Sequence, residues 1–227
     1  MNEVIRVNMI VEGQTEEAFV KEVLAPYLSE RDVFPVARRV TTSRKRRARG
    51  GMTSYGRAKK DIEIWLRQDT EAYCTTMFDL YGLPTDFPGY EETRHLQGGH
   101  ARVSRLEAAF EEDVGSRRFI SFFLLHEFEA LLLSQPEKLD RVLSLQQVKS
   151  RLPDLQRMLA DFGGPEAVND DPETAPSKRL IHLYPGYDKI LFGVLVAQDI
   201  GIDGIRARCP HFDEWVSKLE QLTASLN

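Results

Sequence analysis

Hydrophobic residues gather into short runs along the first half of the chain. The first run comprises Val4, Ile5 and Val7–Val11, and only Arg6 and Asn8 interrupt it. Continuous apolar runs of this length are typical of buried strands. Further runs predict strands at Pro35–Val40, Ala72–Phe78 and Arg118–Leu125.

Apolar residues at helical spacing occupy the segments between and after these runs. A first helix is predicted to begin at Thr15 as its N-cap residue, because acidic residues follow at once. Helices are also predicted over Tyr55–Arg67 and, with a break at its paired glycines, over 91–112. From Pro136 onward the pattern predicts amphipathic helices.

The order of these elements predicts an α/β fold. We expect a mainly parallel central sheet flanked by helices in residues 1–134. An α-helical region, residues 135–227, is expected to pack on the same domain. A chain of 227 residues with 42% hydrophobic residues is long enough for one such domain with a sizeable core.

Two acidic residues stand directly after predicted strands. Glu12 follows the first run, and Asp79 follows the run Ala72–Phe78. Ligands bind at the carboxyl ends of strands in open α/β sheets, where we expect both carboxylates to meet. Neighbouring carboxylates repel unless a cation lies between them, and Mg²⁺ or Mn²⁺ suits oxygen ligands. From the pattern alone, Glu12 could instead be a solvated loop residue and Asp79 a turn former.

A third polar stretch follows the last predicted strand. His126, Glu127 and Glu129 lie where the chain passes from strand to helix. His126 and Glu127 could complete a ligand set with Glu12 and Asp79. The alternative is a helix start at which the helix dipole favours acids, with a histidine that caps or packs. The stretch is not the His-Glu-x-x-His zinc motif, because no second histidine follows at that spacing.

Segment 38–60 has the most biased charge composition in the chain, because it contains many basic residues and no acidic one. Glycines interrupt it, so we predict a flexible loop. The loop could be a solvated basic surface, or an arm that grips the phosphates of a polyanion. Its candidate nucleic-acid-binding residues are Arg44, Lys45, Arg46, Arg47 and Arg49.

Another basic site is predicted where Ser177 opens a helix beside Lys178 and Arg179. A helix start with adjacent bases can cradle a phosphate. If it faces the metal site, Lys178 or Lys189 could neutralise charge on a scissile phosphate. The alternative is an ordinary N-cap with solvated bases.

The net charge and the cysteine content exclude several classes of protein. The net charge of −5 excludes a globally basic nucleic-acid-binding protein, so a polyanion would need a local patch or metal ions. Cys74 and Cys209 form neither a metal-binding spacing nor a disulfide framework. Glu3 and Arg6 argue against a signal peptide, and no apolar run is long enough to span a bilayer. We therefore expect a cytoplasmic protein without a membrane partner.

Several stretches resemble known families. The sequence VEGQTE at 11–16 resembles the first motif of Toprim domains, which are metal-dependent domains of topoisomerases, bacterial primases and nucleases of the overcoming-lysogenization-defect type. Later stretches resemble the DUF4276 family of bacterial proteins, which is regarded as Toprim-like and is often encoded beside ATPases linked to phage defence. These stretches are DLYGLP at 79–84, HEFEALL at 126–132, PSKR at 176–179, and Tyr187 with Lys189.

The resemblance implies a Toprim-like fold and a nuclease activity. The expected reaction is Mg²⁺- or Mn²⁺-dependent hydrolysis of nucleic-acid phosphodiesters, of DNA rather than RNA, in bacterial defence against phages. An ATPase of the AAA or ABC type, encoded nearby, is the expected protein partner, and a homodimer stays open.

The same resemblance assigns roles to the candidate residues. The catalytic residues would be Glu12, Asp79, Glu127 and Lys178. The metal ligands would be Glu12, Asp79 and Glu127, with Glu16, Asp86 and Glu129 in support. The basic loop and Ser177, Lys178 and Arg179 would hold the phosphates.

One position departs from the Toprim pattern. The second Toprim motif is Asp-x-Asp, but Tyr81 occupies the second acidic position of this chain. Asp86 or a later acid would have to supply the missing ligand. This departure supports an alternative function, a non-catalytic Toprim-like binding or sensor subunit that docks on an ATPase through its C-terminal helices.

Overall fold

A five-stranded sheet lies at the centre of the computed structural model, which describes residues 4–40, 54–96, 99–145, 149–168 and 175–226. The strands are β1 (Ile5–Val11), β2 (Val33–Arg39), β3 (Tyr73–Asp79), β4 (Phe119–Ile120) and β5 (Phe123–Leu124). The order is β2-β1-β3-β4, β5 also pairs with β3, and every pairing is parallel. The predicted α/β fold with a mainly parallel sheet is confirmed.

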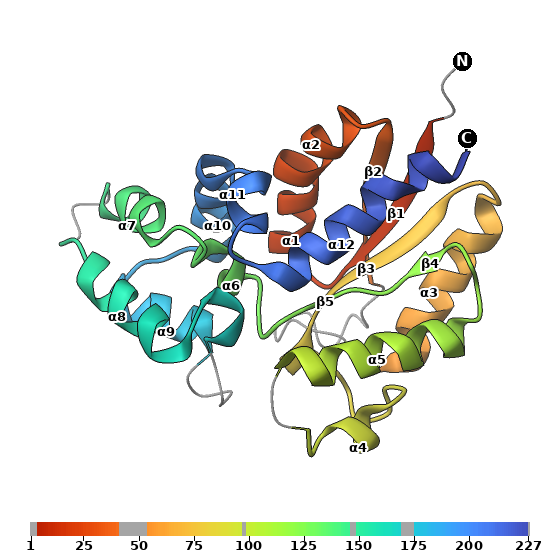
Figure 1. Ribbon diagram of the computed structural model, residues 1–227, viewed down its shortest axis with the longest axis horizontal. Helices are drawn as coiled ribbons and strands as arrows, with labels where there is room; N and C mark the ends of the chain where they lie inside the picture. Colours follow the sequence, from red (N-terminus) through yellow and green to blue (C-terminus); the bar gives the residue numbers. More distant parts are fainter. Residues whose placement is uncertain (1–3, 41–53, 97–98, 146–148, 169–174, 227) are drawn as a thin grey trace.

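Helices cover both faces of the sheet (Figure 1). One face is covered by α1 (Gln14–Phe19), η1 (Val20–Leu24), α2 (Ala25–Ser29) and α12 (Pro210–Glu220). The other face is covered by α3 (Tyr55–Gln68) and α5 (Gly99–Val114). Successive side chains of a strand point to opposite faces, so β1 supplies Met9 to the first core and Ile10 to the second.

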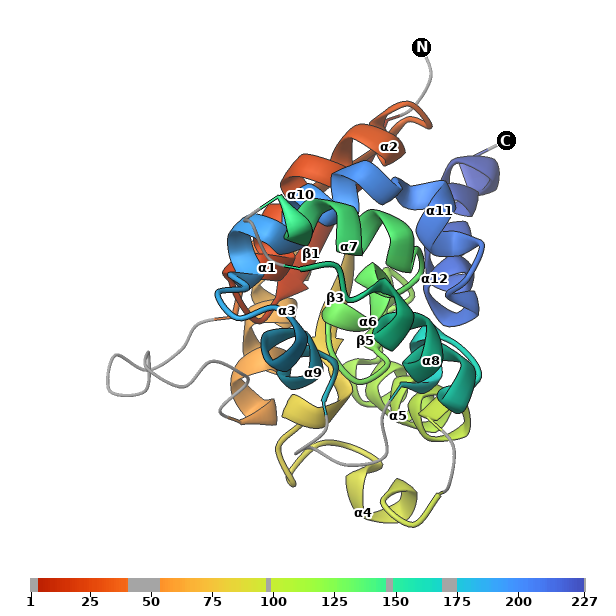
Figure 2. The ribbon, with the colours of Figure 1, turned by 90° about the vertical axis from the view of Figure 1, so that its left-hand side faces the viewer.

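A second group of helices lies beside the sheet, at the edge where its strands end (Figures 1 and 2). It consists of α6 (Glu129–Leu132), α7 (Pro136–Ser144), α8 (Leu152–Phe162), α9 (Pro176–Leu183), α10 (Lys189–Ile200) and α11 (Ile202–Arg206). The short elements α4 (Tyr90–Thr93), η3 (Leu80–Gly82), η4 (Pro165–Ala167) and η6 (Gln221–Leu226) complete the described chain. Within the described ranges, no helix is both long and apolar enough to cross a lipid bilayer.

The predicted helical C-terminal part is confirmed, and one hydrophobic core joins it to the sheet. Val7 and Met9 of β1 share this core with Phe212 and Trp215 of α12. The indole Nε1 of Trp215 also donates a hydrogen bond to Thr75 Oγ1 on β3 at 2.9 Å. The division of the chain at residues 134 and 135 into two parts stays a prediction.

The last predicted strand is interrupted. A continuous strand over Arg118–Leu125 is wrong, because β4 and β5 are separate two-residue strands. Between them the Phe122 N–H donates to Thr76 Oγ1 at 3.0 Å, and the Ser121 N–H donates to Glu111 Oε1 at 2.9 Å. Side chains thus replace the backbone partners that a regular ladder would supply.

A buried polar network fixes the start of α12. The carboxylate of Glu166 accepts the backbone N–H groups of His211 and Phe212, both at 3.1 Å. The imidazole Nε2 of His211 lies 3.0 Å from Glu107 Oε1 on α5. Only 6% of His211 is exposed, so this histidine is part of the buried structure.

This network predicts a pH-dependent stability. Burial alone would lower the pKa of His211, but the adjacent carboxylates, Glu107 first and then Glu166 and Glu214, outweigh burial and raise it. Folded His211 therefore holds its proton at a pH where the unfolded chain has released it. The free energy of unfolding should consequently fall as the pH rises from about 6.5, the unfolded value, through the raised folded pKa.

The expected pH slope can be measured by urea unfolding at several pH values between about 6 and 8. His211→Gln keeps a polar side chain but removes the titrating group, so its stability should vary less over this range. The other groups facing His211 include His100, whose Nε2 lies 3.6 Å from Glu166 Oε2, so His100→Gln serves as the matched control. An identical slope in wild type and His211→Gln would contradict the prediction.

Candidate functional site

The parallel register brings Glu12 and Asp79 together at one edge of the sheet. Val11 of β1 lies opposite Met77 of β3, so the two strands end side by side. Glu12 Oε1 accepts the backbone N–H of Asp79 at 3.0 Å. Gly82 keeps the edge open, because a Cβ atom there would lie 3.3 Å from Glu12 Oε2.

Asp79 is the centre of a group of carboxylates. Its Oδ1 atom is buried and has no hydrogen-bond partner among the described residues. Burial raises the pKa of Asp79 well above its usual value, and four nearby carboxylates raise it further. These are Glu12, Glu16, Glu129 and Glu127, and together with Asp79 we call them the carboxylate cluster.

Glu16 joins this cluster from the first turn of α1. The helix begins at Gln14 with Gly13 as its N-cap, so the prediction that Thr15 caps it is wrong. The reason is that Glu16 Oε2 accepts the Gly13 N–H at 2.9 Å and satisfies the helix start from inside the first turn. Burial raises the pKa of Glu16.

Glu127 and Glu129 enter the cluster from the turn after β5. His126 has a φ of 74°, which bends the chain sharply between the strand and α6. Glu127 Oε2 accepts the backbone N–H of Ser177 at 3.0 Å. Glu129, of which 2% is exposed, has its Oε1 atom 3.2 Å from Nζ of Lys189. Burial raises the pKa of Glu129.

Lys189 is the basic residue that the described structure places against this cluster. Burial alone would lower the pKa of Lys189, but Glu129, Glu127 and Asp79 outweigh burial and raise it. The ammonium group is therefore charged and faces several carboxylates at once. The predicted candidate Lys178 is instead exposed on α9. The sequence signal for Lys189 was its place in the stretch that resembles DUF4276.

The remaining candidates make other contacts or lie outside the described residues. Asp86 Oδ1 accepts the Tyr55 N–H at 3.2 Å and so caps the start of α3. Ser177 is not an N-cap, because α9 begins at Pro176 and the Ser177 N–H is bound to Glu127. The Arg179 guanidinium lies over the Phe162 ring at 4.9 Å. The loop residues Arg44, Lys45, Arg46, Arg47 and Arg49 lie outside the described residues.

Tyr81 makes an aromatic contact at the position where the Toprim pattern has its second aspartate. Its hydroxyl oxygen lies 2.8 Å from His126 Nδ1. The two rings stack with centroids 5.2 Å apart and an angle of 24° between their planes. This position therefore supplies a hydrogen-bonded pair of rings in place of a carboxylate.

Tyr187 is a site residue that the sequence did not assign. Its hydroxyl is buried and has no hydrogen-bond partner among the described residues, which costs about 1–3 kcal/mol. Burial raises the pKa of Tyr187, and Glu129 contributes in the same direction. The cluster is thus flanked by a neutral donor, Tyr187, and a charged donor, Lys189.

The donor set fits an oxygen-preferring divalent cation in kind and in charge. Carboxylates are the ligands that Mg²⁺ and Mn²⁺ prefer, and the buried Asp79 Oδ1 is a ligand atom without a partner in the described chain. Within the described ranges, however, no three His, Cys, Asp or Glu side chains converge closely enough to hold an ion as they stand. Cation binding would therefore draw the carboxylates together.

One family model matches this chain, and solved structures align with it at low sequence identity. The model of the DUF4276 family, described as a domain of unknown function, matches residues 11–220. The C-terminal region of the Burkholderia pseudomallei OLD protein is 16% identical, with a TM-score of 0.44, over 97% of this chain and 100% of that one. The C-terminal region of the Xanthomonas campestris pv. campestris OLD protein is 17% identical, with a TM-score of 0.42, over 94% and 97%. No curated protein matches the sequence.

Proposed function

This chain belongs to the DUF4276 family, and we propose that it is a metal-dependent hydrolase of nucleic-acid phosphodiesters. We further propose that it uses Mg²⁺ or Mn²⁺, cleaves DNA rather than RNA, and acts in the bacterial cytoplasm in defence against phages beside an ATPase partner. The observation that carries the proposal is the carboxylate cluster around Asp79 Oδ1, a buried atom with no hydrogen-bond partner among the described residues.

The cluster is unfavourable without a cation. Two unit charges about 4 Å apart repel by about 4 kcal/mol at an effective dielectric constant of 20, and burial strengthens the effect. Lys189 offsets part of this charge through Glu129. When these five carboxyl groups are ionised, one ammonium group leaves an excess of negative charge, which bound divalent cations would compensate.

The roles of the residues follow from their positions. Glu12, Asp79 and Glu127 would hold the ions, and Glu16 and Glu129 would support them. The ions, when bound, would activate a water molecule and stabilise the leaving oxygen. Lys189 would contact a phosphoryl oxygen and neutralise charge there, a role that the sequence left open between Lys178 and Lys189.

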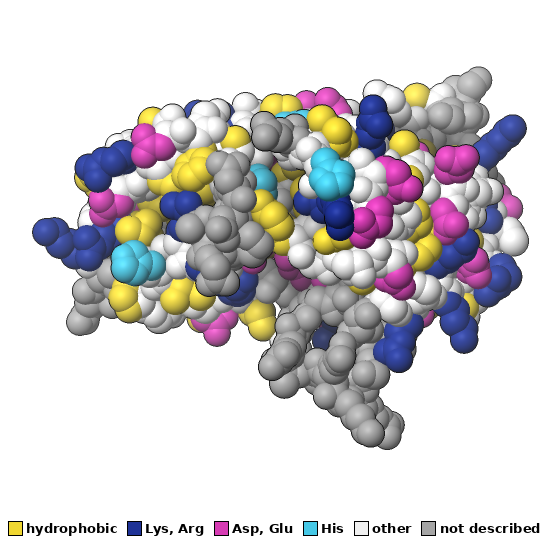
Figure 3. Space-filling view, turned by 90° about the horizontal axis from the view of Figure 1, so that it is seen from below, with side chains coloured by type: hydrophobic (Ala, Val, Ile, Leu, Met, Phe, Trp, Pro, Cys, Tyr) yellow, Lys and Arg dark blue, Asp and Glu magenta, His cyan; other side chains and the backbone are white. Residues whose placement is uncertain are grey.

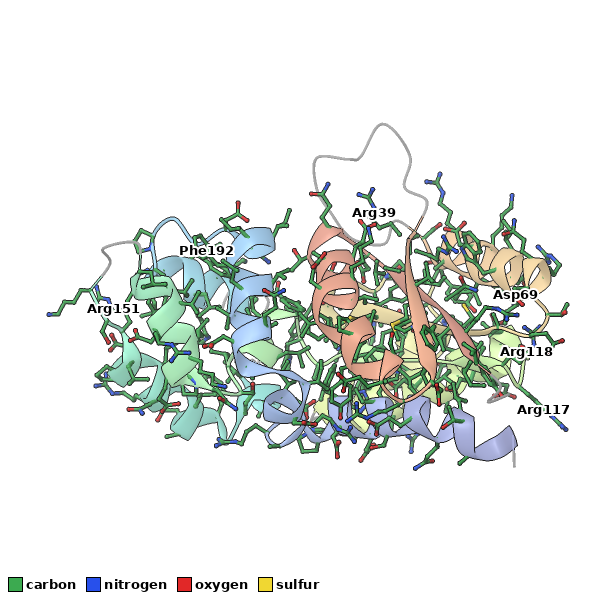
Figure 4. The ribbon with its side chains drawn as sticks, turned by 90° about the horizontal axis from the view of Figure 1, so that it is seen from above. Arg39, Asp69, Arg117, Arg118, Arg151 and Phe192 are labelled. Atoms are coloured by element: carbon green, nitrogen blue, oxygen red, sulfur yellow. The ribbon has the colours of Figure 1, made fainter. Side chains whose placement is uncertain are left out.

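A basic side chain of β2, that of Arg39, lies near this edge of the sheet. Arg39 lies opposite Val11 in the β1–β2 register, beside the strand end that carries Glu12 (Figure 4). The Arg39 guanidinium pairs with Glu17 Oε2 at 3.0 Å. Arg39 is the last residue of β2 and belongs to the basic segment 38–60. On the face seen from below, described acidic and basic side chains are instead interspersed (Figure 3). A phosphate backbone would therefore approach the cluster along the end of β2.

The second candidate function is a non-catalytic binding or sensor subunit of an ATPase complex. The observation that favours it is the contact between Tyr81 and His126, which occupies the place of a second metal-binding aspartate. Under this alternative the protein would co-purify with an ATPase and bind no divalent cation.

The test is calorimetric titration of Mg²⁺ and Mn²⁺ into wild type and Glu12→Ala, beside cleavage assays on plasmid and single-stranded DNA. Glu12→Ala should lose at least about tenfold in metal affinity and should lose cleavage, because both an ion ligand and the acceptor of the Asp79 N–H are removed. Circular dichroism checks that the variant folds.

The matched control is Asp69→Asn, which removes a carboxylate at the opposite edge of the sheet (Figure 4). Asp69 pairs with Arg6 at 2.8 Å, and this hydrogen bond lowers the pKa of Asp69 to about 2. Metal affinity and cleavage should be unchanged in this variant. Full metal-dependent cleavage by Glu12→Ala would refute the proposed site, and wild type without metal binding would favour the non-catalytic alternative.

A further inference from the structure

The hydroxyl of Tyr187 is a buried donor for which the described residues offer no acceptor. Only 8% of the residue is exposed, and the hydroxyl has no hydrogen-bond partner among the described residues. A phenylalanine would fill the same space without an unpaired polar atom. Compared with phenylalanine, the hydroxyl therefore costs stability, and its acceptor is to be sought outside the described residues.

The surrounding structure holds this hydroxyl in place. The Tyr187 N–H donates to the Tyr184 carbonyl at 3.0 Å, and Asp188 caps α10 directly afterwards by accepting two backbone N–H groups. Gly193 lies beside this hydroxyl, because a Cβ atom there would be in ordinary contact with the Tyr187 hydroxyl at 3.6 Å and in tight contact with Phe128 at 3.1 Å. The same Cβ atom would lie 3.7 Å from Thr15. The hydroxyl thus lies among α1, α10 and the start of α6.

These are the elements that carry the carboxylate cluster. Thr15 precedes Glu16, and Phe128 stands between Glu127 and Glu129. Among the described residues the Tyr187 hydroxyl donates to none of these carboxylates: Glu129 lies against Lys189, and Glu127 accepts the Ser177 N–H. The Tyr187 donor is therefore left for an oxygen that a bound molecule brings to the site.

We propose that Tyr187 donates a hydrogen bond to a non-bridging phosphoryl oxygen of the bound phosphodiester, beside the ammonium group of Lys189. This inference rests on the proposed function, because a phosphodiester is the acceptor that such a site would bind. Tyr187 would supply a neutral donor and Lys189, two residues later, a charged one. Together they would fix the orientation of the phosphate against the carboxylates.

The experiment compares wild type with Tyr187→Phe. Cleavage, measured as kcat/KM, should fall by about tenfold or more, because a hydrogen bond to a charged oxygen is lost. Mn²⁺ affinity should stay within about twofold, which separates contact with the phosphate from contact with an ion's water. The melting temperature without ligand should be unchanged or higher. Binding of a phosphorothioate-linked oligothymidylate in Ca²⁺ should weaken in parallel with cleavage.

The matched control is Tyr184→Phe, three residues away. The Tyr184 hydroxyl is also buried, but it donates to Asp140 Oδ1 at 2.6 Å. Its removal should lower the melting temperature and leave cleavage and analogue binding unchanged. A lower melting temperature for Tyr187→Phe with normal cleavage would show a structural hydroxyl and overturn the inference, and so would a parallel loss of Mn²⁺ affinity.

Failure of this inference is distinguishable from failure of the proposed function. If Asp79→Asn is inactive while Tyr187→Phe cleaves like wild type, the proposed function stands and the role of Tyr187 is refuted. If wild type does not cleave at all, the proposed function fails. Binding of the phosphorothioate-linked oligothymidylate then tests the role of Tyr187. Equal analogue affinity in wild type and Tyr187→Phe would then overturn the inference.

Discussion

Replacing Asp79 by asparagine is expected to abolish metal-dependent cleavage while making the metal-free protein more stable. The substitution keeps the shape of the side chain but removes the charge at the centre of the carboxylate cluster. Cleavage should fall by about a thousandfold, as expected when a principal electrostatic group of a site is lost. The melting temperature without metal should rise by roughly 2–10 °C, because relief of a buried, unpaired charge is worth about 1–3 kcal/mol.

The pH dependence of the same variant gives a second measure of this charge. The pKa of folded Asp79 is raised by burial and by Glu12, so the folded protein holds a proton that the unfolded chain releases. Metal-free wild type should therefore lose stability as the pH rises from about 3.9, the unfolded value, through the raised folded pKa. Asp79→Asn should lack this part of the slope.

Calorimetric melting in EDTA and in Mn²⁺ would test both expectations. Mn²⁺ should stabilise wild type and Asp69→Asn but should leave Asp79→Asn unchanged, since only binding to the folded state shifts the transition. A metal-free Asp79→Asn that melts below wild type would show that Asp79 makes a favourable contact. Retained cleavage by this variant would remove the basis of the proposed function.

Replacing Trp215 by alanine is expected to cause the largest loss of stability. Trp215 is 2% exposed, and its ring stacks on Phe122 with centroids 4.2 Å apart and planes 8° apart. Its Nε1 donates to Thr75 on β3 at 2.9 Å. Loss of this side chain should reduce the free energy of unfolding by about 3–5 kcal/mol and lower the melting temperature by roughly 6–20 °C.

Trp215→Phe separates packing from the hydrogen bond. It keeps an aromatic ring against Phe122 but leaves the buried Thr75 hydroxyl without its donor, so the loss should be about 1–3 kcal/mol. Chemical unfolding with the denaturant slope recorded for each variant would measure both losses. A loss below about 1 kcal/mol for Trp215→Ala would show that α12 contributes little to holding the sheet.

The sequence by itself determined the main strands and the acids that follow them. The apolar runs Val7–Val11 and Ala72–Phe78 favour burial, and their short length favours strands over helices. Because parallel strands end at a common edge, the position of Glu12 after one strand and Asp79 at the end of another was enough to predict that they meet. The spacing of hydrophobic residues and the position of acidic ones are local properties of the chain, so a single sequence is enough to predict them.

Only the tertiary structure decided which other groups reach that edge. Glu127 accepts the Ser177 N–H across 50 residues of sequence, and Lys189 rather than Lys178 approaches Glu129 because α10 packs against α1 and α6. The break between β4 and β5 likewise depends on the side chains of Thr76 and Glu111, which arrive from β3 and α5. Such contacts join residues far apart in the chain through side-chain geometry, and no local pattern of hydrophobic and polar residues specifies them.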